Sequence, residues 1–501
     1  MILRVVVAIV LLLALGSADD AWARVGGGES FGRSPGGGGG GGGGDGVPLD
    51  LVILLIDLCI RRPAIGVPIL LVVVGFFYAR TFWSEQNEHH VHRSARLPDA
   101  SVTGPRPAKA TAGIQSLKGR DPGFSVTVFL DFVTLVHRRA HEALGSGEAA
   151  WAWLAPFVGG DARQRLGAGY PGVARIDEIV VGGISIVKAE RRGPYDHLTV
   201  QLETTQLETL HAGRTQRVMV REQWVFHRRQ DARSQPPDDA MRLGCPSCGA
   251  AVEVTAMGAC TTCDTPITEG QLEWQARFAS VTARRRAVVP EIGFTTGGEE
   301  GSVQMPMVQA VDLPAQMRSM QARHPQFDPQ QFGQRVDRVY HALQRAWSAG
   351  QWRDARPYVT DRMYQSLRFW VERYTAHGLR NRLEDVVLRR VRIVKVDLDA
   401  WYESITVRLW GAMRDSIVDD RGRVVGGNAH MPREFSEYWT FLRSAGTDGT
   451  SKGDAPGCPS CGAPLDRVAE TGICGYCDSK ITTGRFDWVL TRIEQPEAYR
   501  G

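Results

Sequence analysis

Apolar residues in the second half of the chain follow first a helical and then a strand-like period. After position 328 they recur every three or four residues, which predicts a helix with one buried face. The apolar stripe consists of Phe332, Val336, Tyr340, Leu343 and Trp347. Asp328 can cap this helix and Pro329 fits its first turn, so the helix is expected to begin there.

Another helix and several strands follow along the chain. Thr360 can cap the helix, and from about Val386 the apolar period falls to two, which predicts strands. The alternating residues are Val391, Ile393, Val396, Ile405, Val407 and Leu409. Phe441 and Trp488 mark two later strands. Helices followed by an antiparallel sheet predict an α+β fold.

The first half of the chain repeats this layout. Its helical stripe contains Phe129, Phe132, Val136 and Leu144. The segment Cys245–Ala250 recurs unchanged as Cys458–Ala463, and Trp274 corresponds to Trp488. We therefore expect an internal duplication. The predicted parts are a first α+β domain at 113–285, a linker at 286–310 and a second α+β domain at 311–495.

The N-terminus has the pattern of a secretory signal. A charged start is followed by a short apolar run, and Ala21-Trp22-Ala23 resembles a cleavage site, so residues 1–23 are expected to be a cleaved signal peptide. The alternative is an uncleaved signal anchor. Residues 24–47 include an unbroken glycine run and are expected to form a disordered spacer, because they can bury almost no apolar surface.

Residues 48–83 form the expected membrane segment. Residues 49–60 are too short to span a bilayer and place charged side chains on one helical face, which favours an interfacial helix. Residues 64–83 are long enough to span and end in aromatic residues, which predicts a single transmembrane helix. The alternative is a pair of buried core helices. Residues 84–112 are expected to be a linker.

Eight of the nine cysteines fall in four C-x-x-C pairs. The predicted metal ligands are Cys245, Cys248, Cys260 and Cys263 in one ribbon at 243–268, and Cys458, Cys461, Cys474 and Cys477 in another at 456–482. Four thiolates in two knuckles suit tetrahedral zinc, with iron and disulfides as alternatives. Four sulfurs leave no open coordination position, so we expect two structural zinc ions, each holding a ribbon inserted in a hairpin.

The cysteines and the charge balance restrict the setting of the protein. Paired thiols at ribbon spacing favour a reducing compartment, so the soluble region is expected on the cytoplasmic side of a bacterial-type inner membrane. The chain has 59 basic and 55 acidic residues, for a net charge of +4, which argues against nucleic acid as a partner. The sequence leaves the oligomeric state undetermined.

Four segments of the second half carry a resemblance to a known family: Phe327–Phe332, Ala346-Trp347, Leu367–Arg373 and Val386–Leu409. Through them the second half resembles the C-terminal domain of the import-motor scaffold subunit (subunit forty-four) of the mitochondrial inner-membrane translocase, and its bacterial membrane-anchored relatives. It implies a cone-shaped fold similar to nuclear transport factor two, membrane association and an apolar cavity suited to lipid. Two copies with inserted ribbons, and no recognisable chaperone-docking region, depart from the family, so a role in protein import is not carried over.

These features favour a membrane-anchored, non-enzymatic scaffold that presents tandem lipid- or protein-binding domains. Arg284–Arg286 and Arg389, Arg390 and Arg392 can meet anionic headgroups or simply be solvated strand ends. The aromatic stripes are expected to face the core, with pocket lining as the alternative. One alternative function is an enzyme of the same fold acting on a small apolar substrate, and another is a ribosome- or RNA-associated membrane adaptor. Asp397, Asp399 and Tyr402 cluster at a strand turn, but turn chemistry explains them, so no catalytic residue is assigned.

Overall fold

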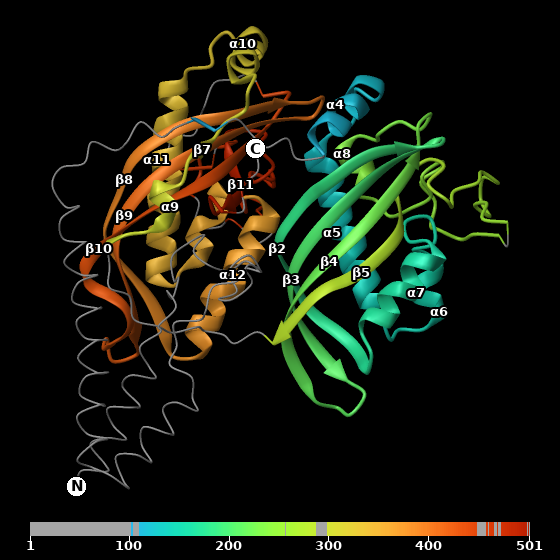
Figure 1. Ribbon diagram of the computed structural model, residues 1–501, viewed down its shortest axis with the longest axis horizontal. Coiled ribbons are helices and arrows are strands. Elements are labelled where there is room, and N and C mark those ends of the chain that lie inside the picture. The colour runs from blue at the N-terminus through green and yellow to red at the C-terminus, as the bar shows by residue number, and fades with distance from the viewer. Residues whose placement is uncertain are drawn as a thin grey trace, which may run out of the picture. The chain divides into compact units, whose positions relative to one another are not determined.

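Two mainly antiparallel sheets with helices packed on them are the largest layers in the computed structural model of this protein (Figure 1). Residues 102–501 fall within one compact unit. The structure describes residues 102–103, 110–255, 257–286, 298–447, 457–458, 460–464, 468, 472–497, 499 and 501. The expected signal peptide, glycine-rich spacer and membrane segment lie outside these residues, as does most of the linker at 84–112. Within the part of the chain that the structure describes, no helix is both long and apolar enough to cross a bilayer.

The first sheet has four strands in the order β2-β3-β4-β5, each antiparallel to its neighbour. Figure 1 shows α5 lying along one face of this curved sheet. The elements are α4 (Thr111–Arg120), α5 (Val126–Ala143), α6 (Glu148–Ala152), α7 (Gly160–Gly169), β2 (Val173–Arg192), β3 (Tyr195–Leu210), β4 (Thr215–Arg229), α8 (Pro237–Ala240) and β5 (Gln275–Arg286). The first cysteine segment lies between β4 and β5, two strands that pair directly, as the sequence predicts.

The second sheet has the order β11-β10-β9-β8, and β6 pairs in parallel with β10. Its elements are β6 (Gly298–Glu299), α9 (Gly301–Gln304), α10 (Leu313–Arg323), α11 (Pro329–Ala349), the 3-10 helix η2 (Trp352–Tyr358), α12 (Asp361–Ala376), β8 (Leu379–Leu398), β9 (Tyr402–Asp419), β10 (Val424–Ser444) and β11 (Val489–Glu494). The second cysteine segment again separates two directly paired strands, β10 and β11. A separate parallel ladder joins β1 (Val102–Thr103) to β7 (Met307–Val308).

The helix predicted after Asp328 is α11, and its cap is as expected. The Asp328 carboxylate accepts a hydrogen bond of 2.8 Å from the backbone N–H of Gln330, which satisfies one of the free donors of the first turn. The helix ends at Gly350, which adopts the left-handed conformation with φ of +68°. α12 begins after Thr360 as predicted, although the Thr360 side chain makes no capping hydrogen bond.

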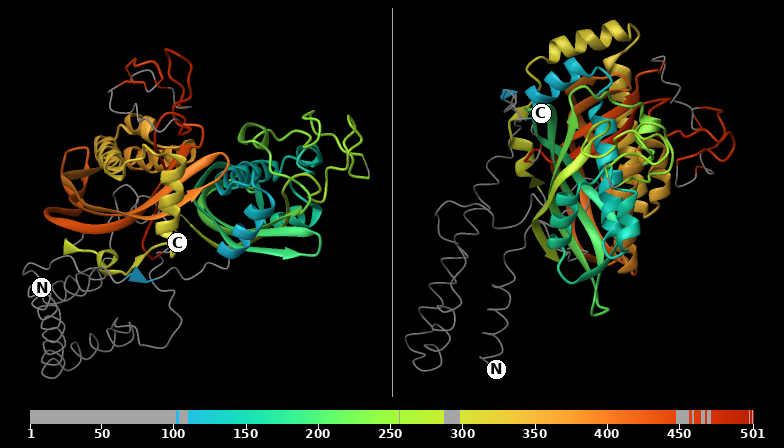
Figure 2. Two further views of the ribbon diagram at one scale, coloured as in Figure 1. Left: turned by 90° about the horizontal axis from the view of Figure 1, so that it is seen from above. Right: turned by 90° about the vertical axis from the view of Figure 1, so that its right-hand side faces the viewer.

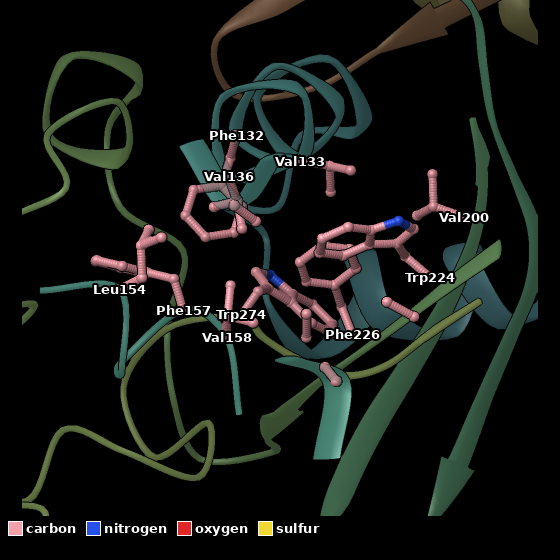
Figure 3. Close-up of a cluster of buried hydrophobic side chains, with 14 of the residues drawn as sticks. Phe132, Val133, Val136, Leu154, Phe157, Val158, Val200, Trp224, Phe226 and Trp274 are labelled. Carbon is pink, nitrogen blue, oxygen red and sulfur yellow. The ribbon is translucent and has the colours of Figure 1, made fainter. Parts of the chain in front are cut away.

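The aromatic stripes of the helices are buried in the core. In the first half, Phe129 packs edge-on against Phe226 and Trp274, with ring centroids 5.7 and 5.1 Å apart. Figure 3 shows Phe132, Phe157 and neighbouring apolar residues filling the space between helix and sheet. In the second half, Phe332 makes the same contacts with Phe441 and Trp488. Removal of these rings from water supplies much of the free energy that holds the helices on the sheet in each half.

The segment that the sequence assigns to the linker at 286–310 is partly folded. Residues 298–308 contain β6, α9 and β7. The buried Glu300 carboxylate pairs with Arg433 of β10 at 2.5 Å, and Arg408 of β9 donates to the carbonyl oxygen of Ser302 at 2.9 Å. These contacts fasten the segment to the second sheet, where β6 pairs with the part of β10 that β11 does not reach.

Two glycines, one inside α11 and one at its end, provide a test of where the helix stops. Ala at position 350 would have to adopt a left-handed conformation, so Gly350→Ala should lower the free energy of unfolding by about 1–2 kcal/mol. Gly333 lies inside the helix, where a methyl group would meet open space. Gly333→Ala should therefore raise the free energy of unfolding by up to about 1 kcal/mol. Denaturant unfolding of both variants measures the two shifts. If both substitutions changed the free energy of unfolding in the same direction, the assigned end of the helix would be contradicted.

Candidate metal centres and a buried histidine cluster

The four cysteines predicted as the first set of metal ligands lie close together in the structure. The four sulfur atoms of Cys245, Cys248, Cys260 and Cys263 lie within 4.8 Å of one another, and all four cysteines are free thiols. The Sγ atoms of Cys245 and Cys263 are 3.9 Å apart. Gly249 follows the first knuckle with φ of +74°, a conformation that a residue with a side chain adopts only with strain. Figure 2 shows this segment as irregular loops beyond the sheet.

The second site has the same construction. The sulfur atoms of Cys458, Cys461, Cys474 and Cys477 also lie within 4.8 Å of one another. The Sγ–Sγ distances are 3.8 Å for Cys458–Cys477 and 4.0 Å for Cys461–Cys474. Gly462 takes the left-handed conformation that Gly249 takes in the first knuckle. The sequence repeat therefore places eight thiols in two matching clusters.

The thiol geometry fits a metal ion in each cluster. A tetrahedral ion with bonds of about 2.3 Å to sulfur separates its ligands by about 3.8 Å, which agrees with the observed distances. The backbone N–H groups of Ser247 and Thr262 point at Cys245 and Cys260, both at 3.4 Å, as donors to thiolates do. Each cluster can thus hold one metal ion, which would cross-link the two knuckles.

The protonation of the thiols differs within each cluster. Hydrogen bonding to Thr265 lowers the pKa of Cys263 to about 6, and hydrogen bonding to Ser479 does the same for Cys477. Burial raises the pKa of Cys245 to about 11. One thiol of each cluster is therefore a thiolate at neutral pH, and is suited to capture a cation first.

A buried arginine and a tryptophan connect each cysteine segment to its sheet. Arg228, at the end of β4, stacks over Trp274, which precedes β5, with 4.7 Å from guanidinium to ring centroid. Arg443 stacks in the same way over Trp488 at 4.6 Å. Both arginines also pair with buried carboxylates, Arg228 with Asp121 at 2.6 Å and Arg443 with Glu403 at 2.8 Å. The two ends of each inserted segment are thereby held together.

The acidic residues at the strand turn have a structural role. Asp399 Oδ1 accepts hydrogen bonds from the backbone N–H groups of Trp401 and Tyr402, at 2.8 and 2.7 Å, which is the geometry of an Asx-turn. Lys118 pairs with Asp397 at 2.7 Å. The structure thus agrees with the interpretation that turn chemistry explains this group.

The two arginine clusters differ in their surroundings. Arg284 is engaged inside the first half, where it pairs with the buried Glu208 and lies over the Tyr170 ring. By contrast, Arg389 and Arg390 line a surface groove of about 610 Å³ between α11 and β8. Its remaining lining residues are Gln330, Gly333, Gln334, Asp337, Arg338, Leu388 and Val391. Arg389 and Arg390 thus line a groove, whereas Arg286 and Arg392 are exposed without lining it.

A cluster that sequence analysis did not assign lies inside the first half. His137 and His141 are one turn apart on α5, and both rings reach the Glu222 carboxylate of β4. The Nε2 atoms of His137 and His141 lie 2.7 and 3.0 Å from separate oxygens of Glu222. Tyr170 also donates to this carboxylate, and Trp224 Nε1 does so at 2.9 Å. The spacing of four residues between the histidines was the available signal.

Burial and the shared carboxylate set the charges in this cluster. Burial is the main cause that lowers the pKa of His137 to about 4, so this ring is neutral. Burial also opposes ionisation of His141, but the Glu222 carboxylate outweighs it and raises the pKa of His141. The same histidines hold the pKa of Glu222 well below its usual range, against the effect of burial. The cluster therefore places an ionised carboxylate between a neutral His137 ring and a more basic His141 ring.

One cysteine substitution tests the metal clusters directly. Cys461→Ser removes one of four ligands, so it should reduce the metal content by one ion per chain and lower the melting temperature. Ser460→Ala changes the adjacent residue, whose hydroxyl hydrogen-bonds to that of Ser479, and should keep the ion. Elemental analysis of the purified chain measures both. An unchanged metal content in Cys461→Ser would refute the assignment of these ligands.

Comparison with known proteins locates one family in the chain. No curated protein matches it significantly. Residues 314–452 match the family model described as the Tim44-like domain, which extends from α10 through β10. This is the family that the sequence resembles, and it covers the helices and strands on which the resemblance depends. The second half of the chain therefore contains a Tim44-like domain.

Proposed function

We propose that this protein is a membrane-anchored, non-enzymatic scaffold that binds partners at a bilayer surface through two tandem domains. The observation that carries the proposal is the Tim44-like domain at 314–452, since that family consists generally of scaffolds associated with membranes. The cone-shaped fold similar to nuclear transport factor two is part of the same proposal. Helices lying on a curved antiparallel sheet support it.

Recurring contacts support the tandem arrangement. The arginine–tryptophan stack and the aromatic triad of helix, sheet and final strand occur in both halves with nearly equal distances. In both halves, the cysteine segment interrupts the last two paired strands. We assign the first domain to 113–285 and the second to 311–495, and we include β6 and α9 as an extension of the second sheet.

The metal in each ribbon is proposed to be zinc with a structural role. Its ligands would be the eight cysteines of the two clusters. All four coordination positions would be filled by sulfur, so neither ion could bind a substrate. Zinc supplies cross-linking energy when bound, and the ribbons have little apolar core of their own, as the small cluster around Val468 and Ile481 illustrates.

We propose the groove between α11 and β8 as the surface that meets the membrane, and an anionic lipid headgroup as its ligand. Arg338, Arg389 and Arg390 line it, against the single acidic residue Asp337. Arg389 also pairs with Glu434 at 2.9 Å, so part of its charge is already balanced. The cavity beneath Phe124 and Trp274 holds only about 20 Å³, which is too small for an acyl chain.

Residues 48–83 are proposed to anchor the protein in a bacterial-type inner membrane, with the domains in the cytoplasm. If so, the full chain should remain in the membrane fraction after alkaline carbonate washing, and deletion of 48–83 should release it. Immunoblots of the fractions measure the distribution. Release of the full chain by carbonate would contradict an integral anchor.

The lipid surface is tested with the fragment 102–501 and vesicles that contain anionic lipid. Arg389→Glu combined with Arg390→Glu should weaken co-sedimentation about tenfold or more, because each basic residue near an anionic surface contributes about 1 kcal/mol. The matched control is Arg421→Glu with Arg423→Glu, which makes the same charge change at the exposed β9–β10 turn. Equal binding by the two double variants would exclude the groove as the contact surface.

A further inference from the structure

The buried histidine cluster presents three metal-ligating groups to one point. One ligand atom from each of His137, His141 and Glu222 lies within 4.8 Å of the other two. All three side chains are completely buried. The hydroxyl of Tyr170 lies 3.1 Å from His141 Nε2, so a fourth ligand atom, an oxygen, is within reach of the same point. Two imidazoles and a carboxylate are a ligand set that zinc, iron and manganese accept.

Hydrogen bonding fixes which nitrogen of His141 faces the carboxylate. Its Nδ1 lies 2.7 Å from the backbone carbonyl oxygen of His137, which can only accept, so Nδ1 carries a proton. In a neutral ring the Nε2 lone pair would then face Glu222 Oε1 at 3.0 Å, two acceptors in direct contact. A proton carried by either of the two atoms, or a metal ion between them, resolves this contact. A carbonyl that holds Nδ1–H is the usual support of a histidine ligand.

The carboxylate has its own supporting contact. Trp224 Nε1 donates to Glu222 Oε2 at 2.9 Å and orients the carboxylate toward α5. Another buried carboxylate, Glu208, interacts electrostatically with His141 and pairs with Arg284. The surroundings are otherwise aromatic, with the ring centroids of His137 and Trp224 5.5 Å apart. The groups around the three ligands thus orient them and exclude water.

The second half shows that the histidines are not needed to bury this carboxylate. Glu437 occupies the position that Glu222 has relative to its tryptophan, and Trp439 Nε1 donates to it at 2.9 Å. Glu437 is also fully buried, with Gln495 donating at 3.1 Å. On α11, Tyr340 and Gln344 occupy the positions that correspond to His137 and His141. The carboxylate–tryptophan pair is thus common to both halves, and the ligating imidazoles occur only in the first.

We propose that His137, His141 and Glu222 bind a divalent transition-metal ion, with the Tyr170 hydroxyl as a fourth ligand or its hydrogen-bond partner. The ion displaces the proton between His141 and Glu222 to solvent. The proton on Nε2 of His137 moves to Nδ1, an atom without a hydrogen-bond partner in the structure, so that the Nε2 lone pair faces the ion. The ligand atoms of this site are nitrogen and oxygen, whereas those of the cysteine clusters are sulfur. Complete burial makes it a structural site in the core of the first half.

The test compares metal content in the full chain, purified in detergent, with that of His137→Tyr combined with His141→Gln. This variant introduces the residues found at the corresponding positions of α11, which a helix on such a sheet accommodates. We expect one metal ion fewer per chain by elemental analysis. Because the result is a difference, it does not depend on how many ions the cysteine clusters hold. Equal metal content in the two proteins would overturn the proposal and leave a protonated ion pair.

Cobalt exchange and X-ray absorption separate this site from the cysteine clusters. After cobalt substitution, the thiolate charge-transfer absorption should be unchanged in the double variant, which also shows that it is folded. Cys461→Ser should lose part of that absorption and keep the ion of the histidine cluster. The X-ray absorption spectrum of the unsubstituted metal in the wild-type chain needs no variant. Nitrogen or oxygen neighbours are expected, and an all-sulfur first shell would overturn the proposal.

Discussion

The stack of a buried arginine on a tryptophan holds each half of the structure together. Each sheet is interrupted before its last strand by a long cysteine segment, and the chain must return to the correct register after it. Trp488 receives the returning chain: Arg443 covers its ring, and Arg335 of α11 donates to its carbonyl oxygen at 3.0 and 3.1 Å. Trp488 thus connects the helix, the sheet and the ribbon. Its contacts with the two arginines help to offset the conformational entropy lost when the loop closes.

The two halves preserve this framework and differ at one face of their long helices. Where α5 presents two histidines to a buried glutamate, α11 presents a tyrosine and a glutamine. Both halves have a buried glutamate that accepts a hydrogen bond from a tryptophan indole. The halves therefore differ in the helix side chains that lie beside this pair. Two halves with the same aromatic contacts can differ at such a face without losing their packing, because the aromatic triad lies nearer the other end of the helix.

The sequence was most informative where the chemistry is local. Cysteine spacing predicted the four thiols that meet in each cluster, and the stripe from Phe332 predicted the buried face of α11. Strand ends were less predictable: β8 begins at Leu379, because pairing with β9 extends a strand beyond its apolar alternation. The pairing of β6 with β10 and the contact of His141 with Glu222 join residues far apart in sequence, so no local pattern indicates them. The domain boundaries remain predictions.

The position of the ribbons between the last two strands also concerns the order in which the chain folds. β5 and β11 are edge strands of their sheets, and each can pair only after the preceding segment has closed into a loop. A metal ion that joins the two knuckles shortens that loop and so raises the rate at which the final strand finds its neighbour. Metal supply would then act on the kinetics of assembly during synthesis, in addition to the stability of the finished protein.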